Sequence, residues 1–232
     1  MDDLHVVEVA QQDQRLGRQV VHDPRSRGFA APRELDLPTR SFRHRIYGPR
    51  GLPNQRVGCC TGVDQCVKAN ARGNRVMGQI LGIDTAETLY SRATQLDPWD
   101  GDWPPTDTGS SALAACKAAV EAGVIDRYEW IFGGVDQVLS VLRTRPVGVG
   151  TWWTWSMFDP DPETLLVDTA GARAGGHQWS IIGWDRRLDA FEGLCWWGEG
   201  WGRRGMFRIR RTHLGELLAD DGDAHITLRR TP

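Results

Sequence analysis

Three of the five cysteines of the chain fall within residues 54–66, which read NQRVGCCTGVDQC. Such a cluster could form a disulfide, hold a metal or supply a nucleophile. An odd number of irregularly spaced cysteines, in a chain without an export signal, favours reduced thiols. A zinc site needs two pairs of Cys or His at short spacing, and the nearest histidines, His44 and His22, complete no such set. The cluster therefore favours a nucleophile.

A nucleophilic thiol is well placed at the N-terminus of a helix, where unpaired backbone N–H groups and the helix dipole favour thiolate over thiol. Cys60 has that position, because apolar residues recur at helical spacing in the segment after it, TGVDQCVKANARG. Gln55 precedes it and could donate an N–H to an oxyanion, while a histidine from elsewhere would act as base. His177, in AGGHQWSIIGWD, precedes an apolar strand that would carry it to the site.

The elements that must position these residues change character near residue 146. Before it, the pattern predicts three amphipathic helices over residues 61–73, 110–123 and 134–146, ended by Gly73, Gly123 and Pro146. After it, short apolar or alternating runs predict strands at 146–153, 177–185, 194–200, 205–211 and 224–230. Residues 97–109, rich in Pro, Gly and Asp, predict a loop. Helices followed by strands indicate an α+β protein.

From about Leu37 to Arg211, the chain resembles the papain-like cysteine peptidases, and most closely their compact bacterial and phage-type members. NQRVGCCTG is similar to the family's Gln, Gly-x-Cys turn and helix, and GGHQWSIIGWD to its Gly-Gly-His strand. WWGEGWGRRGMFRI is similar to its closing Trp-Gly motif, and DTGSSALAACKAAVEAGV to its glycine-bearing substrate strand and following helix. The motifs stand in the family's order, which is more specific than any one motif.

The resemblance implies an α+β, papain-like fold of two lobes with the active-site cleft between them. A helical lobe at about 58–145 would be followed by an antiparallel, β-barrel-like lobe at about 146–230. Residues 1–36 would form a polar, basic N-terminal arm ahead of a papain-like domain at 37–232. The long helical pro-segment of secreted members is not expected, but a short arm could still occlude the cleft.

The same resemblance implies a role for each site residue: Cys60 as nucleophile, His177 as general base, Gln55 as oxyanion donor, Gly109 and Gly176 beside the bound peptide, and Trp197 as a shield over the histidine. One position departs from the family. Cys195 stands where the family has the asparagine that orients the histidine ring, and a thiol is a poorer acceptor for an imidazole N–H. We therefore expect reduced activity.

These assignments imply a cysteine peptidase that hydrolyses peptide bonds through an acyl-thioester on Cys60. Its partner would be a peptide or protein substrate, and no cofactor or metal is expected. Cys195 and the basic arm keep a second class open, a papain-like module that binds or builds a structure, for example in a phage particle. A third class is a transferase or cell-wall peptide amidase that uses the same Cys and His.

Charge is unevenly distributed: residues 15–56 hold ten arginines against three acidic residues, whereas residues 84–168 are mostly acidic. The arginines could bind nucleic acid or an acidic partner, or cover the chain's own acidic face. Arginine outnumbers lysine 26 to 2 throughout, which is typical of a coding bias and disfavours nucleic acid as a partner.

The chain shows no apolar run of about 18 residues and no signal-peptide pattern at its N-terminus. This predicts no membrane partner and a cytoplasmic location, with association with a virus particle as the alternative. The oligomeric state stays open.

Overall fold

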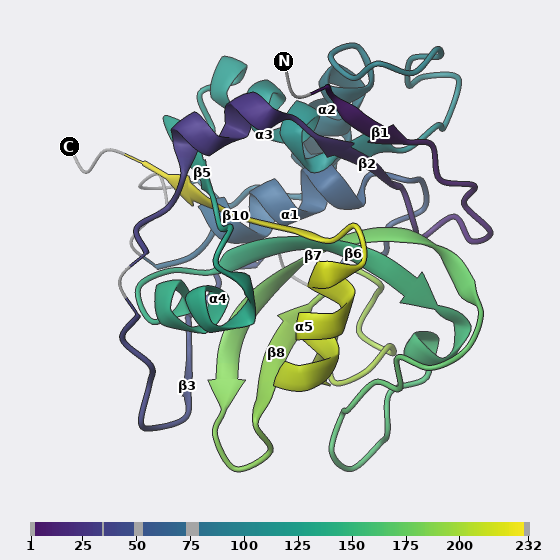
Figure 1. The fold of residues 1–232 in the computed structure, drawn as a ribbon. Helices are drawn as coiled ribbons and strands as arrows, with labels where there is room; N and C mark the ends of the chain where they lie inside the picture. The colour runs from purple at the N-terminus through teal and green to yellow at the C-terminus, as the bar shows by residue number, and fades with distance from the viewer. Residues whose placement is uncertain (1–2, 34, 49–52, 73–78, 230–232) are drawn as a thin grey trace.

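The structure is a computed structural model that describes residues 3–33, 35–48, 53–72 and 79–229. Its larger sheet is antiparallel and twisted, and β7 is its longest strand (Figure 1). The strands follow one another in the order β5 (Arg127–Trp130), β10 (Asp223–Leu228), β6 (Val147–Thr154), β7 (Arg173–Asp185), β8 (Ala190–Leu194) and β9 (Met206–Arg210), and β3 (Phe42–Arg43) pairs with β7.

A smaller sheet holds the N-terminal strands on the helical side of the molecule (Figure 1). It contains β1 (His5–Val7), β2 (Arg18–His22) and β4 (Ser110–Ser111), with β2 parallel to β4. The helices are α1 (Cys60–Ala69), α2 (Ile83–Thr94), α3 (Ala112–Glu121), α4 (Gly134–Leu142) and α5 (Arg211–Ala219), with short 3-10 helices at η1 (Pro24–Phe29) and η2 (Trp155–Phe158).

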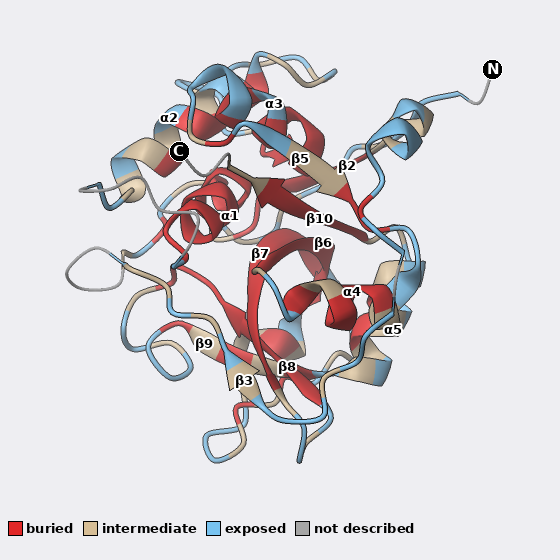
Figure 2. Cartoon of the chain, turned by 90° about the vertical axis from the view of Figure 1, so that its left-hand side faces the viewer, coloured by how far each residue is buried: buried red, intermediate tan, exposed pale blue. Residues whose placement is uncertain are grey.

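Helix α1 lies between α2 and α3 on one side and the large sheet on the other, and all ten of its residues are buried (Figure 2). Its apolar residues Val63, Cys66 and Val67 pack in one hydrophobic cluster with Leu89 of α2. A Cβ added at Gly62 would stand 2.1 Å from a backbone oxygen of α2, so only glycine permits this close approach. The helix that carries Cys60 is therefore fixed on every side.

The main core lies around the large sheet and includes Trp153, Trp179 and Phe207. Two residues of the predicted N-terminal arm, Leu16 and Val20, belong to this same core and are almost completely buried. Part of the segment 1–36 is thus packed against the large sheet, and the division of the chain at residue 36 stays a prediction.

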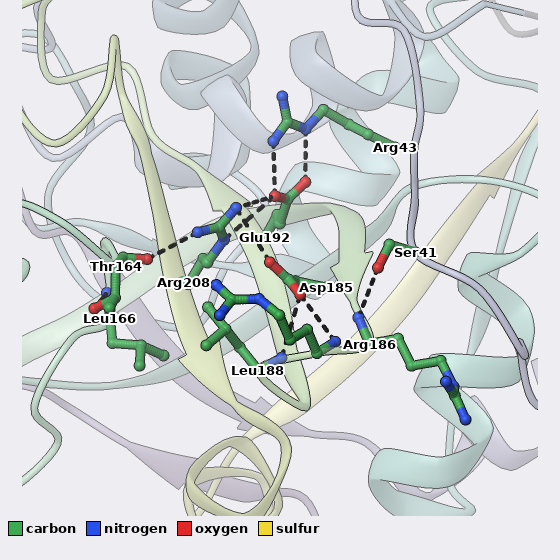
Figure 3. Close-up of polar contacts among 10 residues, drawn as sticks. Ser41, Arg43, Thr164, Leu166, Asp185, Arg186, Leu188, Glu192 and Arg208 are labelled. Atoms are coloured by element: carbon green, nitrogen blue, oxygen red, sulfur yellow. Dashed lines mark hydrogen bonds and ion pairs between the residues drawn. The ribbon is translucent and has the colours of Figure 1, made fainter.

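A network of charged side chains fastens the segment before α1 to the outer strands of the sheet. Figure 3 shows the carboxylate of Glu192 between two guanidinium groups, those of Arg43 and Arg208. Arg43 donates to Glu192 at 2.6 and 2.7 Å, and Arg208 donates to the same carboxylate at 3.0 Å. Arg208 also lies 3.4 Å from Asp185 at the end of β7. The carboxylates of Glu192 and Asp185 are thus paired with arginines, and these ion pairs hold neighbouring strands together.

Most elements predicted from the sequence are present. Helices α1, α3 and α4 confirm the three predicted helices, strands β6, β7, β9 and β10 confirm four predicted strands, and residues 97–109 contain neither helix nor strand. The predicted end at Gly73 lies outside the described residues. The strand predicted at 194–200 is wrong beyond Leu194, because the chain turns away there, with Gly198 at φ +81°.

Helix α2 and helix α5 were not predicted. The buried residues of α2 are Ala86, Leu89, Tyr90, Ala93 and Thr94, which together give a weak helical pattern. The division into lobes at about 58–145 and 146–230 stays a prediction; α4 belongs to the first range by sequence, yet it packs against α5 and β7. None of the described helices is long and apolar enough to cross a membrane.

Candidate active site

Cys60 is the first residue of α1, and Cys59 before it makes no side-chain cap hydrogen bond to the helix N-terminus. The thiol is completely buried and receives a backbone hydrogen bond from Gln178 of β7. Burial raises the pKa of the Cys60 thiol to about 12, although that hydrogen bond and the charge of Arg18 act in the opposite direction. In this structure, Cys60 is therefore a neutral thiol at pH 7.

His177 lies on β7, next to the residue that donates to Cys60, and is 1% exposed. Burial and, to a smaller extent, the positive charge of Arg15 lower the pKa of His177 to about 3. Its ring is enclosed by Trp197, with ring centroids 4.6 Å apart, and by Trp153, at 5.0 Å. The imidazole is therefore neutral and shielded from water.

The two ring nitrogens of His177 have different surroundings. Nε2 lies 3.2 Å from the sulfur of Cys195, whereas Nδ1 has no hydrogen-bond partner. Burial raises the pKa of the Cys195 thiol well above its usual range, so this partner is a neutral thiol. Nδ1 is the nitrogen left free to take a proton, and it is not yet hydrogen-bonded to Cys60.

Gln55 lies in the turn before α1, and its backbone N–H is anchored on the carbonyl oxygen of Trp196 at 2.8 Å. Its side-chain Nε2 donates to two backbone carbonyl oxygens, those of Arg15 at 3.0 Å and Val57 at 2.9 Å. The amide that could stabilise an oxyanion thus already holds a peptide carbonyl that comes from the N-terminal part of the chain.

That carbonyl belongs to residues 11–18, which we call the crossing segment. It bridges both sides of the site: the N–H of Gly17 donates to the Gly176 carbonyl at 3.1 Å, and the N–H of Ser110 donates to the Gly17 carbonyl at 2.8 Å. The contact is close, because a Cβ at Gly17 would stand 2.1 Å from the Gly58 oxygen. The crossing segment explains why Cys60 and His177 are inaccessible.

The predicted peptide-contacting residues lie along the same segment. A Cβ at Gly109 would stand 2.5 Å from the Gly17 oxygen, and one at Gly176 would stand 2.2 Å from the Arg18 oxygen. Trp197 covers His177, as predicted by position, and the Arg15 guanidinium lies 5.2 Å from its ring centroid. The structure thus brings all seven residues singled out in the sequence to one region, although their roles stay predictions.

Sequence reasoning missed two supports of this region. The carboxylate of Asp107 accepts from the Gly58 N–H at 2.9 Å and from the Tyr90 hydroxyl at 2.5 Å, and that hydroxyl accepts from the Gly109 N–H at 2.9 Å. Asp107 and Tyr90 therefore set the distance between the turn before Cys60 and the strand beside the crossing segment. Asp107 lies in a loop rich in Asp and Pro, where no local signal distinguishes it.

All five cysteines are free and buried. Within the described ranges, no group of three or more His, Cys, Asp or Glu side chains is arranged to hold a metal ion. The site residues themselves, a thiol at a helix N-terminus, an imidazole and an amide donor, are groups that can carry out nucleophilic chemistry.

Comparison with known proteins places the fold. No protein-family model and no curated protein sequence matches the chain. Among solved structures, it is similar to xylellain, a cysteine protease from Xylella fastidiosa, at 14% identity over 96% of this chain and 98% of that chain, with a TM-score of 0.73. It is also similar to procathepsin B S9 from Trypanosoma congolense, at 14% identity over 94% and 87% of the two chains, with a TM-score of 0.65.

A third similar structure is digestive procathepsin L 3 of Tenebrio molitor, at 13% identity over 93% and 76% of the two chains, with a TM-score of 0.64. The chain thus has the α+β fold of papain-like cysteine proteases, which confirms the predicted fold class. Its placement among bacterial or phage-type members stays a prediction.

Proposed function

We propose that the chain is a cysteine peptidase that hydrolyses peptide bonds through an acyl-thioester on Cys60, and that this structure is its closed form. One observation carries the proposal. The amide of Gln55, beside the helix N-terminus that bears Cys60, donates to the peptide carbonyl of Arg15 at 3.0 Å. Gln55 can thus donate to a peptide carbonyl oxygen, and a donor to the substrate carbonyl is what amide hydrolysis uses to stabilise the oxyanion, which supports the proposal.

The reaction follows from the atoms present once the crossing segment moves. Nδ1 of His177 takes the proton of the Cys60 thiol, and the sulfur attacks the substrate carbonyl carbon to form a C–S bond. Gln55 and the backbone N–H of Cys60 donate to the resulting oxyanion. When the C–N bond breaks, the imidazolium returns the proton to the leaving amine, and water then hydrolyses the thioester with His177 as base.

The closed form cannot start this sequence. With the thiol pKa at about 12 and the imidazole pKa at about 3, proton transfer from sulfur to nitrogen is strongly uphill. Water and the helix dipole would bring the two values together after the segment withdraws, because burial is the largest cause of both shifts. Displacement of residues 11–18 is thus the expected control of activity.

Electrophilic labelling tests the proposal. The guanidinium of Arg15 lies 4.3 Å from the ring centroid of Phe158 and 5.2 Å from that of Trp197, so Arg15→Ala removes contacts that hold the crossing segment in place. We expect E-64 or iodoacetamide to label Cys60 faster in Arg15→Ala than in the wild type, by mass spectrometry, and a peptide library to be cleaved. Cys60→Ala should abolish both signals.

Arg25→Ala is the matched control, because Arg25 pairs with Asp23 two residues earlier, as Arg15 does with Asp13, but its side chain is exposed and lies outside the crossing segment. It should leave labelling unchanged. Absence of Cys60 labelling and of cleavage in Arg15→Ala would refute the peptidase.

The second candidate is a papain-like module that binds or builds a structure. Its supporting observation is that Leu16 belongs to the main core, so closure of the site is part of the folded state. In that case, Arg15→Ala should change neither labelling nor hydrolysis. A cytoplasmic location, and association with a virus particle as its alternative, also stay proposals.

A further inference from the structure

The side chain of Arg18 enters a closed pocket beside the candidate site. Arg18 is the first residue of β2, and its side chain is 0% exposed. Its Nε and Nη2 donate to Oδ2 of Asp223 at 3.1 and 2.7 Å, and Nη2 also donates to the backbone carbonyl of Asp221 at 2.6 Å. The pocket thus offers a carboxylate and a carbonyl to one guanidinium.

The sheet makes room for this side chain with a glycine. Asp223 of β10 is the cross-strand partner of Gly150 of β6, and a Cβ at Gly150 would stand 2.1 Å from Nε of Arg18. The same Cβ would stand 2.7 Å from the Asp223 carboxylate. A side chain at position 150 would therefore fill the pocket, so glycine keeps it open.

The pocket lies close to the nucleophile. Arg18 directly follows Gly17, whose backbone is hydrogen-bonded to Gly176 on one side and to Ser110 on the other. The positive charge of Arg18 also acts on the Cys60 thiol. Any peptide that replaced the crossing segment in these backbone contacts would have a side chain facing Asp223.

Withdrawal of the segment would leave Asp223 without its cation. Arg18 is the ion-pair partner of Asp223 among the described residues, and the carboxylate side chain is only 6% exposed. A buried carboxylate without a counter-ion is strongly disfavoured, which creates a preference for a new cation. Because the pocket offers two acceptor atoms in a fixed arrangement, a planar guanidinium suits it better than an ammonium.

We propose that the pocket formed by Asp223, Gly150 and the Asp221 carbonyl is the specificity pocket of the peptidase and takes an arginine side chain of the peptide substrate. The inference rests on the proposed function for its biological meaning. The crossing segment then occupies the site as a peptide of the chain's own, with Arg18 in place of the substrate arginine.

Binding to the pocket can be tested without catalysis, in a Cys60→Ala background. Arg18→Ala empties the pocket, n-propylguanidinium is the probe, and the neutral n-propylurea is its control. We expect the cation to raise the Tm of Arg18→Ala by roughly 2–4 °C when it is several-fold above its Kd, and the urea to have no effect. In Arg18→Ala/Asp223→Asn, the response should disappear.

If Arg18→Ala does not fold alone, rescue becomes the measurement: n-propylguanidinium should restore its near-UV circular dichroism, and should fail to do so in the double variant. The proposal that this pocket binds a guanidinium would be overturned if n-propylguanidinium had no effect. It would also be overturned if both compounds had the same effect, or if both variants responded equally.

Cleavage specificity is measured separately with Cys60 intact. In Arg15→Ala/Arg18→Ala, in which the crossing segment is loosened and the pocket is empty, a peptide library should show a preference for arginine over leucine at one position, which Asp223→Asn should reduce roughly tenfold or more. Cleavage without a preference for arginine would contradict the proposed specificity of the pocket but would support the proposed peptidase activity. Binding of n-propylguanidinium without any peptide cleavage would support the pocket as a guanidinium site and contradict the proposed peptidase activity.

Discussion

Two buried histidines on the same sheet have opposite surroundings. His177 of β7 contacts two neutral groups, the Cys195 thiol and the Trp197 ring, and burial together with the nearby charge of Arg15 lowers its pKa to about 3. His225 of β10 is equally buried and lies 3.3 Å from the Asp64 carboxylate. Burial alone would lower its pKa, but Cys116 and Asp64 raise it to about 9.

The surroundings of His225 are charged and linked by ion pairs and hydrogen bonds. Lys68 lies 2.7 Å from Asp64, one turn away in α1, and 2.5 Å from Nε2 of His225. The hydroxyl of Ser180 on β7 donates to the other oxygen of Asp64 at 2.6 Å. Burial raises the pKa of Asp64, but Lys68 and His225 outweigh it and lower the value to about 2.

The comparison shows that burial has two outcomes in one fold. Around His225, fixed charges and hydrogen bonds tie α1 to β7 and β10, and nothing there needs to move. Around His177, no ion pair among the described residues compensates for the lost water, and under the proposed function the site becomes active only after the crossing segment moves. We therefore expect stability effects at the first site and activity effects at the second.

The largest effect is expected for Lys68→Ala. Removal of the cation leaves Asp64 as a buried charge with one partner fewer, which should lower the free energy of unfolding by roughly 3–5 kcal/mol. The control is Lys117→Ala, since Lys117 is the other lysine and is exposed on α3; surface substitutions of this kind stay within about 0.5 kcal/mol. Urea unfolding measures both, and equal midpoints would contradict the role given to the charged site.

A pair of glutamines separates activity from stability. In the Arg15→Ala background, Gln55→Ala should lower the rate of peptide hydrolysis by roughly 10²- to 10³-fold, the usual effect of losing one oxyanion donor. Gln65→Ala removes a side chain whose Nε2 lies 3.3 Å from Nε2 of His225. It should lower stability and leave the rate unchanged, so a loss of rate in Gln65→Ala would weaken the distinction between the two sites.

The two histidines should give opposite dependences of stability on pH. The folded pKa of His177 lies below the unfolded value of 6.5, so the unfolded chain binds a proton first and stability falls as pH drops from 6.5 towards 3. The folded pKa of His225 lies above 6.5, so its contribution is complete below pH 6.5 and is lost as pH rises through about 9.

Matched variants test these windows. His177→Gln should flatten the acid side of a plot of urea midpoint against pH, and His225→Gln should flatten the alkaline side. The comparison fails if both variants change the same side.

The smallest effect is expected for Cys195→Asn. An amide oxygen would accept the imidazole N–H better than the thiol that now lies 3.2 Å from Nε2 of His177. In the Arg15→Ala background, the acylation rate should rise or stay level, as measured by burst kinetics with an active ester. A marked loss of rate would mean that the Cys195 thiol itself takes part in the chemistry.

Local sequence determined the elements that carry the chemistry. The helical spacing of Val63, Cys66 and Val67 placed Cys60 at a helix start, and the apolar run after His177 placed it on a strand. Such patterns are local, because the faces of a helix or strand follow from backbone periodicity alone. Helix α2 was not predicted, because the alanines on its buried side give little contrast in hydrophobicity between its faces.

Only the tertiary structure decided which side chains contact one another across these elements and how their pKa values are shifted. Arg18 and Asp223 are 205 residues apart in the sequence. No local pattern links the first residue of β2 with the first residue of β10. The opposite pKa shifts of His177 and His225 likewise depend on neighbours from distant segments. The sequence by itself therefore determined which groups could act, whereas the fold decided that the chain's own Arg15–Arg18 peptide covers them, because burial and long-range contacts exist only after the chain has packed.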